Sequence, residues 1–216
     1  MKNHAIYCFS RQDILGMMLF PLLAGCATVV IQPSAPENAK PAFLLEHGQH
    51  SSVVLPGKSG GIVRYSYGDW DYYALGKKGI SSGLRALHGP TLAGLGRREL
   101  AAPATKEGVH ASVRVGILAV HELKVPASAI ENLRAELDGI YRANIASLIY
   151  NRDIDLEFVH HPVPYSSEHN SNRVVADWLR ALGCTVEGPT FVPDWKIRKS
   201  RKSLESALAL SCFRDS

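Results

Sequence analysis

The pattern of apolar and polar positions predicts a chain that mixes strands and helices between residues 41 and 195. Short apolar runs closed by glycine, proline or polar residues are typical of strands, and they occur at 42–45, 52–55 and 62–67. Alternating apolar positions predict a long strand over 109–120 and another over 153–159. A short helix is expected at 80–87, before Gly89 and Pro90.

Two segments have the spacing of amphipathic helices. Apolar residues recur every three or four positions after Pro126, namely at Ile130, Leu133, Leu137, Ile140 and Tyr141. Ser128 and Glu131 have the spacing of a capping box at the start of this helix. Residues 170–182 have a second apolar face, and Gly183 stands where a glycine would end that helix. The order of elements predicts an α+β domain, in which an antiparallel sheet packs against helices.

The first 25 residues have the pattern of an export signal. The apolar run 14–24 is shorter than the roughly 20 residues of a membrane-spanning helix. Lys2 and Arg11 precede this run and supply the positive charge of such signals. The ending Leu-Ala-Gly-Cys resembles a bacterial lipobox, which implies cleavage before Cys26 and attachment of lipid to its sulfur.

This resemblance implies a protein of the bacterial cell envelope, anchored to the membrane through the lipid on Cys26. Ala27 follows the cysteine, where an aspartate would resemble an inner-membrane retention signal, so an outer-membrane location facing the periplasm is expected. The chain then divides into a signal peptide at 1–25, a lipidated tether at 26–40, a folded domain at 41–195 and a basic C-terminal tail or helix at 196–216.

Composition narrows the classes of partner. About 190 of the 216 residues remain after the signal peptide, which is the size of one domain with a sizeable core. The formal charge of +4 falls to +3 without the signal peptide, which argues against nucleic acid. The basic run at 196–202 is either a solvated tail or a contact with anionic envelope polymers. Cys184 and Cys212 either form a disulfide in an oxidising compartment or remain free thiols.

Three features carry candidate chemistry, and each has an ordinary structural alternative. His50 leads into an apolar run and is either a general base or a structural hydrogen-bond donor. Ser171 begins a predicted helix, where a nucleophile lies beside free N–H groups but where capping residues are also common. Asp69 either orients a histidine or forms a turn beside Gly68.

Four motifs occur together in a recognisable order: His47-Gly48-Gln49-His50-Ser51, Tyr67-Gly68-Asp69-Trp70-Asp71-Tyr72-Tyr73, Leu84-Arg85-Ala86-Leu87 and Asn170-Ser171-Asn172-Arg173. Over residues 42–190 the chain resembles an uncharacterised bacterial lipoprotein family of the circularly permuted, NlpC-type papain-like superfamily. The resemblance implies a permuted papain-like fold with His50 as the catalytic histidine and Ser171 in the nucleophile position. Asp69 is the candidate for the third catalytic group, and His47 carries no role over from the family.

The chain departs from the family pattern at the nucleophile, where Ser171 replaces the usual cysteine, and at Gln49, where tryptophan is usual. A serine hydroxyl stays protonated and needs a base during attack, whereas a cysteine can react as a thiolate. Two functions therefore remain open. One is an amide or ester hydrolase or acyltransferase using His50 and Ser171 on peptidoglycan peptides or lipid acyl groups. The other is a catalytically inactive binding or scaffolding lipoprotein.

A histidine cluster precedes the second helix, at His160, His161 and His169. Adjacent residues on a strand point to opposite faces, so His160 and His161 are not expected to share a metal ion. The cluster also lacks the ligand spacings of common zinc sites, and neither a metal nor another cofactor is expected. His169 is an alternative base near Ser171.

Overall fold

The computed structural model describes residues 27–77 and 89–200. Its strands are β1 (Thr28–Ile31), β2 (Lys40–Glu46), β3 (Ser51–Pro56), β4 (Ile62–Asp69), β5 (Thr91–Leu100), β6 (Ala119–Val125), β7 (Ile149–Asn151), β8 (Leu156–Tyr165), β9 (Thr185–Glu187) and β10 (Trp195–Arg198). Its helices are α3 (Lys106–Ser112), α4 (Ala127–Ala143) and α5 (Ser171–Ala181), with short helical turns η2 (Trp70–Ala74) and η3 (Ile145–Ser147).

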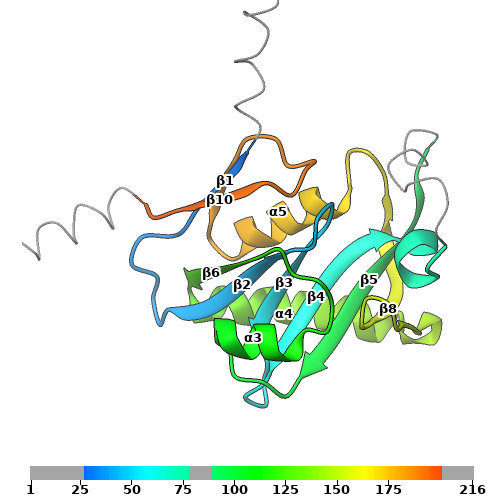
Figure 1. The fold of residues 1–216 in the computed structure, drawn as a ribbon, viewed down its shortest axis with the longest axis horizontal. Coiled ribbons are helices and arrows are strands. Elements are labelled where there is room, and N and C mark those ends of the chain that lie inside the picture. Colours follow the sequence, from blue (N-terminus) through cyan, green and yellow to red (C-terminus); the bar gives the residue numbers. More distant parts are fainter. Residues whose placement is uncertain (1–26, 78–88, 201–216) are drawn as a thin grey trace, which may run out of the picture.

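These elements form a large sheet of seven strands and a small sheet of three (Figure 1). The large sheet has the order β6-β2-β3-β4-β5-β8-β7, and all of its neighbouring strands are antiparallel. In the small sheet β1 pairs with β10 in parallel and with β9 in antiparallel orientation. The predicted α+β class, with an antiparallel sheet packed against helices, is confirmed.

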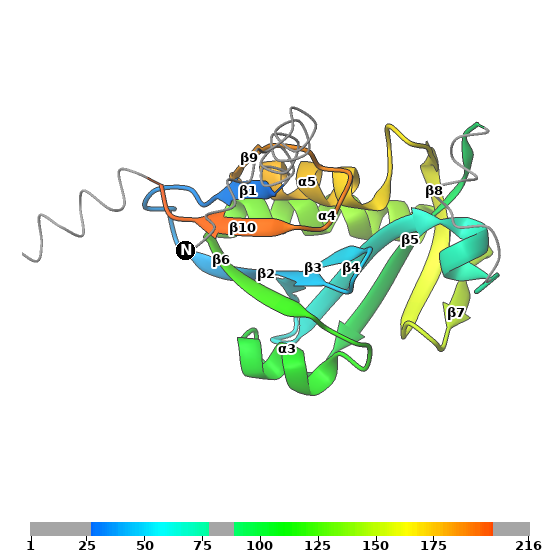
Figure 2. The same ribbon diagram turned by 45° about the horizontal axis from the view of Figure 1, so that its top comes forward.

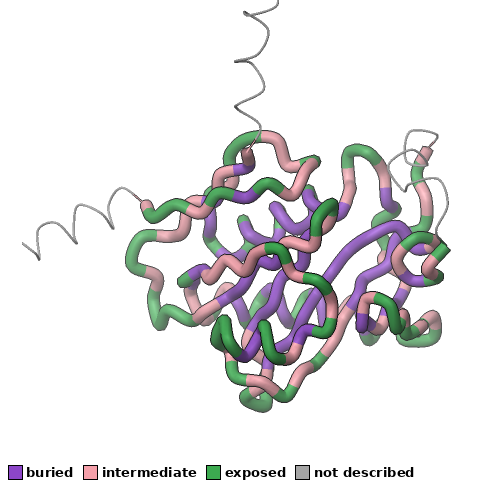
Figure 3. The backbone as a smooth tube through the Cα atoms, in the orientation of Figure 1, coloured by how far each residue is buried: buried purple, intermediate pink, exposed green. Residues whose placement is uncertain are grey.

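Helices cover both faces of the large sheet (Figure 2). Tyr65 and Tyr67 of β4 belong to the main core, together with buried residues of α4 and α5. Ile62 of the same strand packs on the opposite face in a smaller cluster that includes Val109 of α3. All eight residues of β4 are buried, as expected for a strand covered on both faces, and Figure 3 shows burial concentrated in the central strands.

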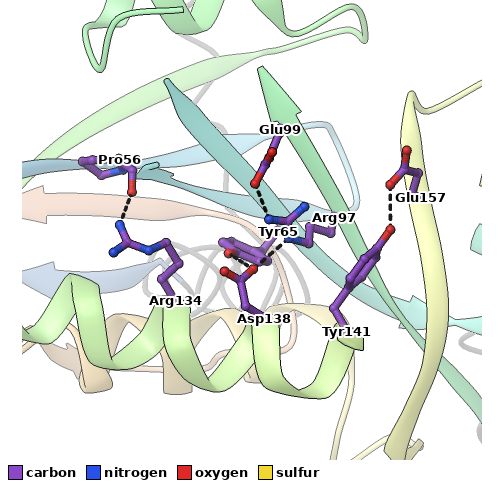
Figure 4. Close-up of polar contacts among 8 residues, drawn as sticks. All are labelled: Pro56, Tyr65, Arg97, Glu99, Arg134, Asp138, Tyr141 and Glu157. Carbon is purple, nitrogen blue, oxygen red and sulfur yellow. Dashed lines mark hydrogen bonds and ion pairs between the residues drawn. The ribbon is translucent and has the colours of Figure 1, made fainter. Parts of the chain in front are cut away.

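A polar network joins α4 to the sheet (Figure 4). Asp138 of α4 accepts hydrogen bonds from the Tyr65 hydroxyl at 2.7 Å and from Arg97 Nε at 2.8 Å. One turn further along the helix, Tyr141 donates to Glu157 of β8 at 2.6 Å. The helix is therefore fixed to β4, β5 and β8 by directional contacts as well as by its apolar face.

The periodic segments were predicted with mixed accuracy. Strands at 42–45, 52–55 and 62–67 are confirmed as β2, β3 and β4, and the two amphipathic helices as α4 and α5. Gly183 follows α5 with φ at 87°, as expected for the residue that ends a helix. The capping box is wrong, because α4 begins after Pro126 and has no side-chain cap.

The long strand expected at 109–120 is wrong: α3 ends at Ser112 and β6 begins at Ala119. Thr105 caps α3 by accepting from the N–H of Gly108 at 3.0 Å. Val109 and Val113 lie four residues apart, so their spacing fits a helical face as well as strand alternation, and both are buried in the same cluster.

The strand expected at 153–159 begins later, at Leu156. Asp155 has a left-handed backbone with φ at 49°, and residues 152–155 form a turn before β8. The helix expected at 80–87 lies outside the described residues.

The expected tether at 26–40 is partly wrong, because Thr28–Ile31 form β1 and Val30 is fully buried in the main core. The expected C-terminal boundary at 195 is also wrong, since β10 continues to Arg198 and contains the start of the basic run. The two segments pair with each other, so the folded unit extends from β1 to β10.

The signal peptide, Cys26 and Cys212 lie outside the described residues. Cys184 is a buried thiol, and its pairing with Cys212 stays a prediction. Among the described residues, no helix has both the length and the apolarity needed to cross a bilayer.

Candidate functional site

A cavity of about 1230 Å³ brings together distant parts of the sequence. Its walls come from the loop before β3, from β4, from η2 and from the start of α5. His50 and Ser171, the two predicted catalytic residues, both line this cavity. Asp69 is not among the lining residues.

His50 has one ring nitrogen engaged and one free. Its Nε2 lies 2.5 Å from the hydroxyl oxygen of Ser66 on β4. Its Nδ1 is buried and has no hydrogen-bond partner among the described residues. Burial, assisted by His47 and the positive charge of Arg64, holds the pKa of His50 well below its usual value. The imidazole is therefore neutral at neutral pH, and in the tautomer with its proton on Nε2, Nδ1 can accept a proton.

Tyr73 packs against the His50 ring, with ring centroids 4.6 Å apart. Gly68 makes this arrangement possible, because a Cβ at that position would lie 2.2 Å from the Tyr73 ring. The glycine of the 67–73 motif thus leaves room for the aromatic ring beside the histidine.

Of the two roles weighed for Asp69, the hydrogen bonds of its carboxylate fit the turn and not the orientation of a histidine. One of its oxygens accepts from the backbone N–H of Tyr72 at 2.9 Å, and the other accepts from the Thr91 hydroxyl at 2.5 Å. Asp69 therefore caps η2 and fixes the turn that carries Tyr73. The orientation of the His50 ring is set by Ser66, which the sequence reasoning missed.

Ser171 is the first residue of α5 and is buried, with 4% of its surface exposed. Asn170 caps the helix, because its side chain accepts from the N–H groups of Asn172 and Arg173, each at 3.1 Å. The N–H of Ser171 itself has no acceptor within the described ranges. The helix cap is therefore Asn170, and Ser171 lies beside it with a free N–H donor. Ser171 and His50 are both described, and no hydrogen bond joins them.

Three further polar residues line or support the same cavity, on the side of the loop before β3. His47 Nδ1 donates to the carbonyl of Gly116 at 2.8 Å, so its Nε2 is the accepting nitrogen. Nε2 lies 2.8 Å from the Ser52 hydroxyl and 3.3 Å from Nη2 of Arg64. Burial and the charge of Arg64 lower the pKa of His47 to about 4, and His47 is neutral at neutral pH.

The low pKa of His47 predicts a loss of stability in mild acid. The unfolded chain binds a proton near pH 6.5, whereas the folded chain resists it down to about pH 4. The stabilising effect is complete above about pH 6.5 and is lost as the pH falls through 4. We expect the thermal midpoint, measured from pH 8 to 4, to decline over this window. The midpoint of His47→Gln should decline less steeply, and an equal slope in both proteins would contradict the assignment.

Sequence reasoning missed Arg64 and Ser66, although both lie in a correctly predicted strand. A signal was present: they alternate with Tyr65 and Tyr67, so the polar pair had to share one face of a buried strand. That face needed polar partners or a cavity, and it has both.

The histidine cluster does not form part of the cavity wall. His160 contacts the ring of Trp70, and His161 contacts that of Tyr67, on opposite faces of β8 as expected. His169 also packs against Tyr67, and its buried Nε2 has no hydrogen-bond partner among the described residues, so its role as an alternative base stays a prediction. Across the described ranges, no group of three potential ligands is placed to hold a metal ion.

Comparisons with family models, curated proteins and solved structures found no match to this chain.

Proposed function

We propose that this protein is a lipid-anchored envelope enzyme with a permuted papain-like, NlpC-type domain that hydrolyses or transfers an acyl group through Ser171. The observation that carries the proposal is the pair of free groups in one cavity. Nδ1 of His50 is buried without a partner, and the Ser171 hydroxyl and N–H lie at the start of α5. The lipobox ending at Cys26 supports membrane attachment, with the domain facing the periplasm.

The arrangement supports acyl transfer by the following steps. Ser171 Oγ attacks the carbonyl carbon of an amide or ester while His50 Nδ1 takes the hydroxyl proton. The N–H of Ser171 donates to the carbonyl oxygen as negative charge develops on it. The bond to the leaving group breaks as His50 returns the proton to that group, and water or an acyl acceptor then releases the acyl-serine. Ser66 keeps the His50 ring in position through Nε2.

A second candidate function is a non-catalytic binding or scaffolding role. Two observations favour it: serine stands where the family has cysteine, and no hydrogen bond joins Ser171 to His50 in the described structure. Resting active sites often have long catalytic distances that shorten when substrate binds, so the catalytic proposal is retained.

Covalent labelling of the full-length protein tests the proposal. A fluorophosphonate probe should label the wild-type protein at Ser171, and Ser171→Ala should abolish the labelling. Ser112→Ala serves as the matched control, because the hydroxyl of this serine bonds back to the carbonyls of Gly108 and Val109 within α3. Labelling should be accompanied by hydrolysis of a panel of muropeptides and acyl esters.

Ser171→Cys separates the two functions. In a competent site the thiol should react with iodoacetamide below pH 7, because the helix N-terminus stabilises the thiolate. Failure of both the fluorophosphonate reaction and this thiol reaction would overturn the catalytic proposal in favour of binding. Reaction of the cysteine variant alone would mean that only the nucleophile has been lost.

A further inference from the structure

The catalytic cavity contains a buried guanidinium. Arg64 of β4 is 3% exposed and lines the cavity two residues before Ser66. It donates from Nε to Ser52 Oγ at 3.1 Å, from Nη1 to the carbonyl of Ile154 at 3.1 Å, and from Nη2 to His47 at 3.3 Å. An arginine has five N–H donors, so two remain without an acceptor among the described residues.

The charge of Arg64 has no direct counter-ion. Burial lowers its pKa only to about 10, so the group is cationic at neutral pH. All three acceptors are uncharged, and no ion pair to Arg64 is found within the described ranges. Asp155 raises the pKa of Arg64 through its charge without a direct ion pair, and this carboxylate accepts from the Tyr150 hydroxyl at 2.7 Å and lies 3.5 Å from Arg98.

Other charged groups of the cavity do not neutralise Arg64. His47 and His50 are neutral at neutral pH. Asp153 also lines the cavity, but its side chain is exposed, so solvent screens its charge. Burying a cation that has no direct ion-pair partner is costly, and an anion that enters the cavity would recover part of that cost.

We propose that Arg64 is an anion-recognition residue and that the ligand carries a carboxylate or phosphate group beside the reactive carbonyl. A guanidinium binds either group through two parallel N–H···O hydrogen bonds, which fixes orientation as well as position. The placement of the carbonyl at Ser171 rests on the proposed function, whereas binding of the anion does not. The substrate class is then an anionic acyl compound, and a neutral ester is a poor substrate.

Calorimetric titration of the Ser171→Ala protein tests the anion site without any turnover. Glutarate and inorganic phosphate are the two probes, and the one that binds identifies the preferred group. Arg64→Gln in the same background should weaken binding at least about tenfold, as expected for loss of a charged hydrogen bond. Arg64→Lys should retain part of the affinity. Arg180→Gln, which alters an exposed arginine of α5 that pairs with Asp177 outside the cavity wall, should have no effect.

A second measurement does not depend on the folding of an Arg64 variant. In Ser171→Ala, the bound anion should shift the NMR signals of the His47 and His50 imidazoles. Shifts confined to other parts of the protein, absence of binding by both probes, or equal affinity in a folded Arg64→Gln variant would each overturn the inference.

Ester hydrolysis distinguishes failure of this inference from failure of the proposed function. Wild-type protein should prefer mono-p-nitrophenyl glutarate to p-nitrophenyl acetate, and Arg64→Gln should lose the preference. Anion binding without hydrolysis of either ester would refute the proposed enzymatic function but not the anion site at Arg64. Equal hydrolysis of both esters without anion binding would refute the anion site but not the enzymatic function.

Discussion

His50→Ala is expected to lower kcat/KM of the proposed acyl transfer by about 10²- to 10⁴-fold, the usual contribution of a general base. His50 lines the same cavity as Ser171, and its Nδ1 is buried without a partner, so in the proposed mechanism its removal takes away the group that accepts the Ser171 proton. The rate should be measured with the best substrate from the ester and muropeptide panel. A His50→Ala rate within a factor of two of wild type would contradict the assignment.

Ser66→Ala provides the graded comparison. Loss of the hydrogen bond to Nε2 should lower kcat/KM about tenfold and leave KM nearly unchanged, because Ser66 acts through His50 and not on substrate. The pH profile is the diagnostic readout. The depressed pKa of His50 keeps the base form populated below pH 6.5, so wild-type activity should persist into mild acid. A purely structural role for Ser66 would lower the folded fraction without moving this pH dependence.

The parts of the site that are encoded locally could be predicted from sequence. His50 was recognised because it precedes an apolar strand, and Ser171 because it begins a strongly amphipathic helix. Each is a one-dimensional pattern. Their meeting in one cavity depends on the strand order of the large sheet, and only the family resemblance suggested it.

Asp69 illustrates where local pattern reasoning fails. A carboxylate beside a glycine is compatible with capping a turn and with orienting a histidine. The hydrogen-bond donors near the carboxylate oxygens decide between these roles. For Asp69 the donors are the N–H of Tyr72 and the hydroxyl of Thr91. Thr91 lies on the neighbouring strand, and no spacing along the chain reveals that contact.

The small sheet was missed for a related reason. β1 is only four residues long and is followed by a segment with Pro33 and Pro36, so its sequence has the pattern of a tether. Its parallel partner, β10, lies at the other end of the domain. Such a pairing gives no local signal beyond a brief run of β-branched residues.

Asp138→Ala is expected to destabilise the fold by about 3 kcal/mol, because it removes the shared acceptor of Tyr65 and Arg97 from the contact between α4 and the sheet. Asp138 is 8% exposed, so water cannot fully replace the lost acceptor. For a domain of this size the thermal midpoint should fall by roughly 6–12 °C. Urea denaturation gives the free energy of unfolding directly.

The matched control is Asp177→Ala, which removes an exposed ion pair to Arg180 on α5 and should change stability by less than about 1 kcal/mol. Combining Asp138→Ala with Tyr65→Phe measures the coupling, because the alanine substitution should cost less once the tyrosine hydroxyl is gone. Equal costs of Asp138→Ala in both backgrounds would mean that Tyr65 gains nothing from the carboxylate. The stabilising effect of Asp138 would then come from its contact with Arg97, the other donor to this carboxylate in Figure 4.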